Sequence, residues 1–222
     1  MQAVILDCDG VLLESAQIKT EAFAALFRDI CPDRLEEVVA CHLAHEGVSR
    51  YVKFRMVYAE ILKQPLSHEQ EQALGRRFAA LVREALLRAP LVPGAREFLE
   101  SASRSRAYRL FVASGTPEEE LREIARARQL ADWVEEWHGS PRSKSQIIRD
   151  ILRRHGVQAA DAVLVGDAVS DLDAARDTGV TFIGRSAIAN GRFAACPYRI
   201  ADLRELPGVL RRVQQRAEGG AS

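Results

Sequence analysis

The sequence has few of the features that mark an exported, membrane-bound or polyanion-binding protein. Only four cysteines occur among its 222 residues and no two form a CxxC pair, so we expect reduced thiols in a cytoplasmic protein. No apolar run approaches the roughly 20 residues of a membrane-spanning helix, and the N-terminus lacks the basic leader and apolar segment of an export signal. The 31 Lys and Arg residues balance 31 Asp and Glu residues. We therefore expect neither membrane nor nucleic acid as a partner.

The composition is that of a globular protein with a substantial core. Hydrophobic residues make up 47% of the chain and charged residues 28%, which argues against a disordered protein. The length corresponds to one or two domains.

Short apolar runs that stop at turn residues recur along the chain. They cover residues 3–6, 108–113, 162–165 and, more weakly, 180–183. Such runs are typical of strands buried on both faces of a parallel sheet. Helical patterns alternate with them over residues 117–128, 145–155 and 170–177. This alternation predicts a doubly wound, Rossmann-like α/β fold.

One segment, residues 15–89, interrupts the alternation. It contains no strand-like run, and its helical patterns cover residues 21–30, 34–45, 49–62 and 69–88. The sequence therefore predicts an all-helical cap domain over residues 15–89, inserted into an α/β core formed by residues 1–14 and 90–222.

Polar residues of the kind used in catalysis follow three of the predicted strands. Ligands bind at the carboxyl ends of the strands in an open parallel sheet. The residues at these ends are Asp7, Asp9, Ser114 and Asp167, and Lys144 begins a helix nearby. Each alone could simply make a turn or cap a helix, but their matching positions favour an active site.

The same positions carry a resemblance to a known family. The segment DCDGVLLES at residues 7–15 resembles the first motif of the haloacid dehalogenase superfamily, DxDG(T/V)LxDS, and Ser-Gly-Thr at 114–116 resembles the second. Lys144 resembles the third motif, and residues 166–175 resemble the fourth, GDxxxDxxAA. The helical insertion is similar to that of the subfamily containing phosphoglycolate phosphatases and β-phosphoglucomutases, in which a cap follows the first motif.

The resemblance implies a phosphoryl-transfer site with Mg²⁺ as cofactor. Asp7 is then the nucleophile, and Asp9 is the general acid and base, whose carboxylate must stay protonatable near neutral pH beside an anionic phosphate. Asp7 and Asp167 hold the metal, and the backbone carbonyl of Asp9 is a third ligand. Asp171 either supports the metal shell or orients Lys144; alternatively, it is an acid that complements the N-terminus of a helix.

The phosphate-binding groups implied by the same motifs are Ser114, Gly115 and Lys144. The second aspartate, Asp9, discriminates among reactions, because dehalogenases and phosphonate-cleaving relatives lack an acid there. It favours phosphate transfer.

Substrate contacts are expected from the cap. Gly-Val-Ser-Arg at 47–50 resembles a stretch of β-phosphoglucomutase-like proteins whose arginine contacts the far end of a phosphorylated sugar, although Arg50 could instead be a solvated residue of an inter-helix turn. Lys19 stands where many relatives have histidine, and Glu14 replaces an aspartate; both depart from the mutase pattern. His42 and His45 lack a third metal ligand, so we expect them on a helix surface.

These observations predict a Mg²⁺-dependent phosphomonoesterase that forms an aspartyl-phosphate. Its substrate is expected to be a small phosphorylated metabolite: a sugar phosphate, a polyol phosphate or a phosphoglycolate-like acid. A phosphomutase of the β-phosphoglucomutase type and a non-catalytic phosphometabolite-binding protein remain as alternatives. We expect a cytoplasmic monomer or homodimer.

Overall fold

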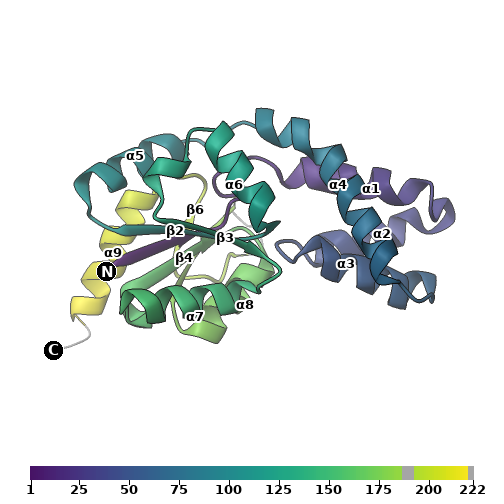
Figure 1. Ribbon diagram of the computed structural model, residues 1–222. Helices are drawn as coiled ribbons and strands as arrows, with labels where there is room; N and C mark the ends of the chain where they lie inside the picture. Colours follow the sequence, from purple (N-terminus) through teal and green to yellow (C-terminus); the bar gives the residue numbers. More distant parts are fainter. Residues whose placement is uncertain (187–192, 220–222) are drawn as a thin grey trace.

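The core of the protein is a parallel sheet of six strands in the order β3-β2-β1-β4-β5-β6 (Figure 1). The computed structural model describes residues 1–186 and 193–219. This topology confirms the predicted α/β fold. The strands are β1 (Ala3–Leu6), β2 (Arg109–Pro117), β3 (Glu136–Ser140), β4 (Ala162–Gly166), β5 (Thr181–Arg185) and β6 (Arg199–Ile200).

The first strand lies in the middle of the sheet. All four residues of β1 are completely buried, and Leu6 is in register with Val112 of β2 and Val165 of β4. Because these parallel strands run side by side, the residues that follow the matched positions reach the same edge of the sheet. This register brings Asp7, the segment after Ala113 and the segment after Gly166 together.

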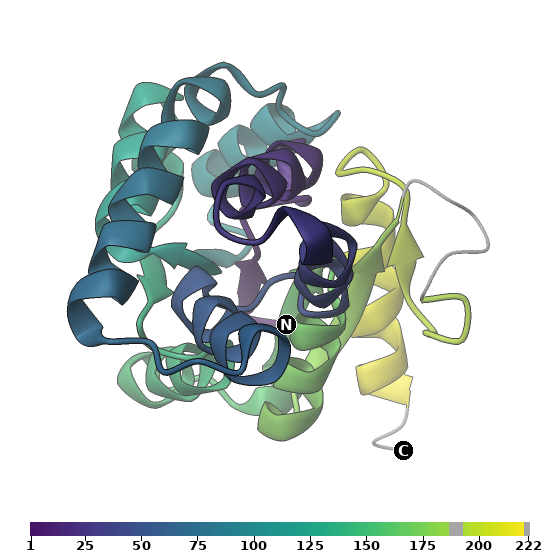
Figure 2. The same ribbon diagram turned by 90° about the vertical axis from the view of Figure 1, so that its right-hand side faces the viewer.

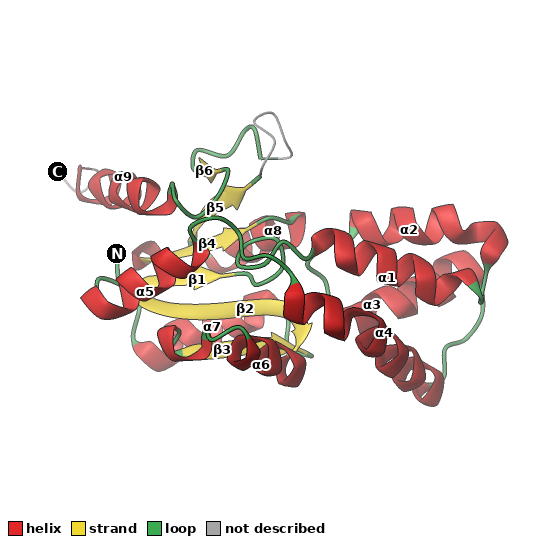
Figure 3. Cartoon of the chain, turned by 90° about the horizontal axis from the view of Figure 1, so that it is seen from above, coloured by secondary structure: helices red, strands yellow, loops and turns green. Residues whose placement is uncertain are grey.

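Helices cover both faces of the sheet, as expected when every strand is buried on two sides. Alternate residues of β1 point to opposite faces: Val4 and Leu6 pack with α5, α6 and α9, whereas Ala3 and Ile5 pack with α7 and α8 (Figure 3). These helices are α5 (Ala95–Ser105), α6 (Glu118–Ala127), α7 (Lys144–His155), α8 (Val169–Thr178) and α9 (Leu206–Gly219).

A block of helices lies to one side of the sheet, beyond the carboxyl ends of its strands (Figures 1 and 2). Four phenylalanines, Phe23, Phe27, Phe54 and Phe78, form its centre, with ring centroids 5.1–6.4 Å apart. No strand occurs within residues 16–88, all of which the structure describes. Its elements are α1 (Ala16–Arg28), α2 (Leu35–Ala44), α3 (Arg50–Met56), a π-helical turn (Val57–Leu62) and α4 (His68–Arg88).

Two chain segments connect this block to the sheet. Leu13 forms an antiparallel bridge with Leu91, and the Glu14 amide donates to the carbonyl of Pro90 at 2.9 Å. The crossing points lie beside the proposed domain boundaries, at 14/15 and 89/90. Among the residues that the structure describes, no helix is both long and apolar enough to cross a membrane.

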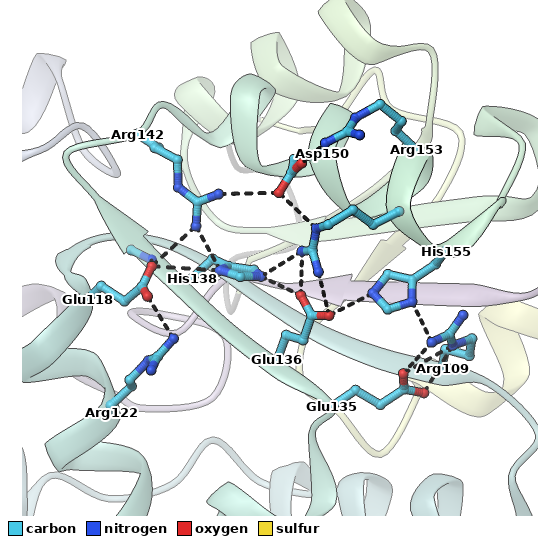
Figure 4. Close-up of polar contacts among 12 residues, drawn as sticks. Arg109, Glu118, Arg122, Glu135, Glu136, His138, Arg142, Asp150, Arg153 and His155 are labelled. Atoms are coloured by element: carbon cyan, nitrogen blue, oxygen red, sulfur yellow. Dashed lines mark hydrogen bonds and ion pairs between the residues drawn. The ribbon is translucent and has the colours of Figure 1, made fainter.

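Edge strand β3 is a strand that the sequence pattern does not predict, because charged residues interrupt it. Glu136 accepts hydrogen bonds from Arg154 (2.8 and 2.5 Å), His155 (2.7 Å) and His138 (2.6 Å) (Figure 4). The Arg154 and histidine hydrogen bonds hold the pKa of Glu136 well below its usual range. The last turn of α7 thus binds the charged side chain of β3, whereas Trp137 packs into the core. This anchoring fixes α7, which begins at Lys144.

Candidate active site

The carboxylate of Asp7 emerges directly from the end of the central strand. It is almost completely buried, with 1% of its surface exposed. One oxygen, Oδ1, accepts from the Cys8 amide at 2.7 Å, and Oδ2 accepts from Lys144 Nζ at 2.6 Å. Cys8 itself packs in the core.

Three carboxylates gather around this lysine. Single oxygens of Asp7, Asp167 and Asp171 all lie within 4.8 Å of one another. Lys144 Nζ also donates to Asp171 Oδ1 at 2.5 Å, while Asp171 Oδ2 accepts from the Ala168 amide at 3.1 Å, at the start of α8. Asp171 therefore orients Lys144 and also caps a helix, which are two of the roles considered from the sequence.

The cluster carries more negative charge than its lysine balances. Burial raises the pKa of Asp7 and of Asp167, and the neighbouring carboxylates raise both further, against the lowering effect of Lys144. Burial acts to lower the pKa of Lys144, but Asp171 and Asp7 raise it more, so this ammonium is retained. Asp7 and Asp171 are buried and Asp167 is partly buried. When all three carboxylates are ionised, the single ammonium leaves them short of two positive charges. An all-oxygen donor set with this deficit fits a hard divalent cation such as Mg²⁺.

The loop after Asp7 needs a glycine beside this cluster. Gly10 has a φ of +70°, and a Cβ built there would lie 1.9 Å from Asp167 Oδ2. Any side chain at position 10 would therefore displace the Asp167 carboxylate.

Asp9, two residues after Asp7, has its own cation. Its Oδ2 accepts from Lys19 and from Thr116 Oγ1 (2.9 Å), and its Oδ1 accepts from Ser15 Oγ (2.7 Å). Burial acts to raise the pKa of Asp9, but Lys19 and the hydroxyl hydrogen bonds lower it to about 2. Without substrate, Asp9 is therefore ionised at neutral pH.

Ser114 and Gly115 lie at the end of β2, facing the helical block. The Ser114 hydroxyl is 3.5 Å from Asp9 Oδ2, and its oxygen accepts from the Thr116 amide at 3.2 Å. A Cβ at Gly115 would lie 2.4 Å from the carbonyl oxygen of Gly47. The absence of a side chain therefore lets the loop between α2 and α3 approach the sheet.

A cavity of about 60 Å³ lies between the strand ends and the helical block, lined by both. Lys19 and Arg50, the two residues expected to contact substrate, line it together with Asp7, Asp9 and Asp167.

Arg50 is not the solvated residue considered as an alternative, because only 5% of its surface is exposed. Its guanidinium donates to both carboxylate oxygens of Glu120 on α6, at 3.0 and 2.7 Å, and lies over the ring of Phe78 at 4.6 Å. The arginine thus joins the helical block to the α/β core.

The expectation that both histidines lie on a helix surface is wrong for His42. Its ring is buried, packs 4.5 Å from that of Phe23 and lines the cavity. Nδ1 of His42 lies 3.3 Å from Nζ of Lys53. The hydrophobic pattern of α2 does not identify position 42 as a core position, because its side chain is a polar imidazole ring.

Three residues at or beside the cavity were not predicted from the sequence: Lys53 and Thr116, which line it, and Glu120, which binds Arg50. Thr116 is the third residue of the Ser-Gly-Thr motif, so the motif indicates it. Lys53 lies three residues after Arg50 and therefore on the same side of a helix, so its spacing indicates it as well. Glu120 had no such signal, since it is one of several acids in the first turn of α6.

Comparisons with known proteins agree with this arrangement. A family model described as haloacid dehalogenase-like hydrolase matches residues 1–179. A phosphoglycolate phosphatase of Synechococcus elongatus is 28% identical over 204 residues, or 89% of this chain and 91% of that protein. A phosphoglycolate phosphatase of Rhodospirillum rubrum is 28% identical over 191 residues, or 82% of this chain and 78% of that protein.

The fold also matches solved structures over its whole length. A β-phosphoglucomutase from Clostridium difficile superposes with a TM-score of 0.80 at 14% identity, covering 100% of this chain and 99% of that one. At this identity the likeness is one of fold.

Proposed function

Because the chain belongs to the haloacid dehalogenase-like hydrolase family, we propose that it is a Mg²⁺-dependent phosphatase that cleaves a small phosphomonoester through an aspartyl-phosphate on Asp7. The observation that carries this proposal is the cluster of Asp7, Asp167 and Asp171, in which Lys144 is bound to both Asp7 and Asp171. The 28% identical phosphoglycolate phosphatases support a phosphoester as substrate.

Asp7 is the nucleophile in this proposal. Its Oδ1 is held by the Cys8 amide, so the carboxylate has a fixed orientation when it attacks phosphorus. Lys144 places a positive charge beside the attacking carboxylate, and Ser114 with the Gly115 amide donates to the phosphoryl oxygens. The phosphoryl group transfers to Asp7, and water then releases it as inorganic phosphate.

Asp9 moves the proton. It protonates the leaving oxygen in the first step and takes a proton from the attacking water in the second. Since Lys19 and Thr116 hold it ionised in the substrate-free protein, proton uptake requires that these contacts loosen when the anionic phosphate binds.

The metal ligands in the proposal are Asp7, Asp167 and the backbone carbonyl of Asp9, with Asp171 behind them. Bound Mg²⁺ would neutralise phosphoryl charge that otherwise repels a carboxylate nucleophile. Lys19 and Arg50 would contact the rest of the substrate from the side of residues 15–89, which we propose act as a cap over the core formed by residues 1–14 and 90–222.

A phosphomutase remains the second candidate because of the fold match to β-phosphoglucomutase. The departures at Lys19 and Glu14 disfavour it. Glu14 forms a two-bond ion pair with Arg185 of β5, at 3.0 and 2.6 Å. This ion pair holds the connecting segment at Glu14 against the sheet. It is formed by glutamate, which is longer than the aspartate that it replaces.

The two candidates differ in their products. We expect the purified protein to release inorganic phosphate from a panel of phosphorylated acids, polyols and sugars in the presence of Mg²⁺, and to stop when EDTA is added. A colorimetric phosphate assay with product analysis by ³¹P NMR measures this. If the main product were an isomeric sugar phosphate, with little free phosphate, the protein would be a phosphomutase and the phosphatase proposal would be wrong.

Metal binding should stabilise the protein, and more so at higher pH. The pKa values of Asp7 and Asp167 are raised in the folded protein, so above about pH 4, the ordinary value for Asp, the folded state holds protons that the unfolded state has lost. As the pH rises, ionisation of these carboxylates therefore lowers the free energy of unfolding. As the pH falls, protons compete with Mg²⁺ for the same carboxylate oxygens. We expect 10 mM Mg²⁺ to raise the unfolding temperature by several degrees at pH 8 and by much less at pH 5.5, as measured by differential scanning fluorimetry.

Asp167→Asn is the matched control for this effect. It keeps the size of the side chain and removes one charged ligand, so the Mg²⁺-induced shift should shrink. An equal shift in this variant, or none in the wild type, would contradict a metal site at Asp167.

A further inference from the structure

Lys53 is a buried cation that the proposed mechanism does not use. It lies on α3, with 5% of its surface exposed, and lines the cavity. Within residues 1–186 and 193–219 it forms no ion pair; its one hydrogen-bond partner is His42 Nδ1, at 3.3 Å. A buried ammonium without a carboxylate partner is costly. A ligand that supplies the missing negative charge would account for it.

The charge of Lys53 is retained near neutral pH. Burial and the charge of Lys19 lower its pKa to about 8, against the opposing effect of Glu46. Burial and the two nearby lysines lower the pKa of His42 to about 3, so its ring is neutral. A neutral ring accepts from the ammonium through Nδ1 and does not repel it.

The other two cations that line the cavity already have carboxylate partners. Lys19 is paired with Asp9, and Arg50 forms two hydrogen bonds with Glu120. Lys53 therefore differs from both, among the residues that the structure describes, in having positive charge with no acid bound to it. A second negative group on a ligand could bind Lys53 without breaking an existing ion pair, whereas binding to Lys19 or Arg50 would compete with Asp9 or Glu120.

We propose that Lys53 binds a second anionic group of the substrate, so that the protein selects small phosphomonoesters that also carry a carboxylate or a second phosphate. This inference rests on the proposed function, because it places the ester phosphate at Asp7. It assigns the anion contact to Lys53, one helical turn beyond Arg50. Neutral polyol phosphates then become poor substrates.

A matched pair of substrates tests the proposal. 2-Phosphoglycolate carries a carboxylate, and 2-hydroxyethyl phosphate has a neutral hydroxymethyl group in its place. We expect kcat/KM of the wild type to be at least about 10-fold higher for 2-phosphoglycolate. Lys53→Gln should lower this value about 10- to 100-fold, the effect of one charged hydrogen bond, and should change kcat/KM for 2-hydroxyethyl phosphate less than about 3-fold. Ethylene glycol bisphosphate shows whether a second phosphate replaces the carboxylate.

Controls separate substrate selection from structure. Lys63→Gln removes an exposed lysine of the same helical block and should leave both substrates unaffected. The unfolding temperature of Lys53→Gln should not fall, because an unpaired buried charge is removed. Equal losses on both substrates, a lower unfolding temperature, or a wild type that prefers the neutral ester would overturn the proposal.

Binding distinguishes this proposal from the proposed function. If no ester of the whole panel is hydrolysed in Mg²⁺, the phosphatase proposal fails, but calorimetry with the Asp7→Asn variant still measures the Kd for 2-phosphoglycolate. Adding Lys53→Gln should weaken this binding about 10- to 100-fold and leave that of 2-hydroxyethyl phosphate unchanged. An unchanged Kd for 2-phosphoglycolate would refute the anion site whatever the chemistry at Asp7.

Discussion

Asp7→Asn should reduce phosphate release by at least about 10⁴-fold, the largest effect expected from a single substitution in this protein. Asparagine has the same shape, but its amide cannot form the aspartyl-phosphate. The fold should survive, because the change removes the charge of one of three crowded carboxylates while Lys144 keeps its bond to Asp171. Phosphate assays and unfolding temperature measure the two parts.

The matching control is a substitution of similar chemistry outside the site. Asp173→Asn changes an exposed acid on α8 and should leave both kcat and stability close to the wild type. Substantial phosphate release by Asp7→Asn would mean that another group attacks phosphorus. We expect a folded but inactive protein that forms no aspartyl-phosphate.

Lys144→Met should damage both stability and activity. The ammonium is the partner of Asp7 and Asp171, at 2.6 and 2.5 Å, and all three side chains are buried. Removing one member of such a cluster leaves buried charge uncompensated, which costs about 3–5 kcal/mol. Turnover should fall about 10³-fold, since the charge beside the phosphoryl group is also lost.

The pH dependence of this variant checks the electrostatic cause. The pKa values of Asp7 and Asp167 are already raised in the wild type, and without the lysine these carboxylates take up protons more readily. Because protonation removes the uncompensated charge, the loss of stability should be smaller at pH 5.5 than at pH 8. Chemical denaturation at both pH values, with Lys63→Met as the control, measures it. A loss independent of pH would indicate a packing defect instead.

Much of the site could be predicted because its residues follow buried apolar strands. The run 3–6 stops at Asp7, and 162–165 stops shortly before Asp167, so the chain itself puts polar groups at strand ends. Edge strand β3 could not be predicted in this way. Its Glu136 is accommodated because the carboxylate accepts hydrogen bonds from Arg154 and His155 of α7 and from the neighbouring His138.

Sequence by itself determined the four inner strands of the parallel sheet, the helical insertion and the order of the polar groups at the sheet edge. Each of these follows from local patterns of burial and turn formation within a few residues. Tertiary structure alone decided which cations are already paired: Arg50 with Glu120, Lys19 with Asp9, and Lys53 with no acid among the described residues. The reason is that ion pairing and protonation depend on through-space distances and burial, which local sequence patterns do not give. Arg50 and Glu120, for example, are 70 residues apart in the chain.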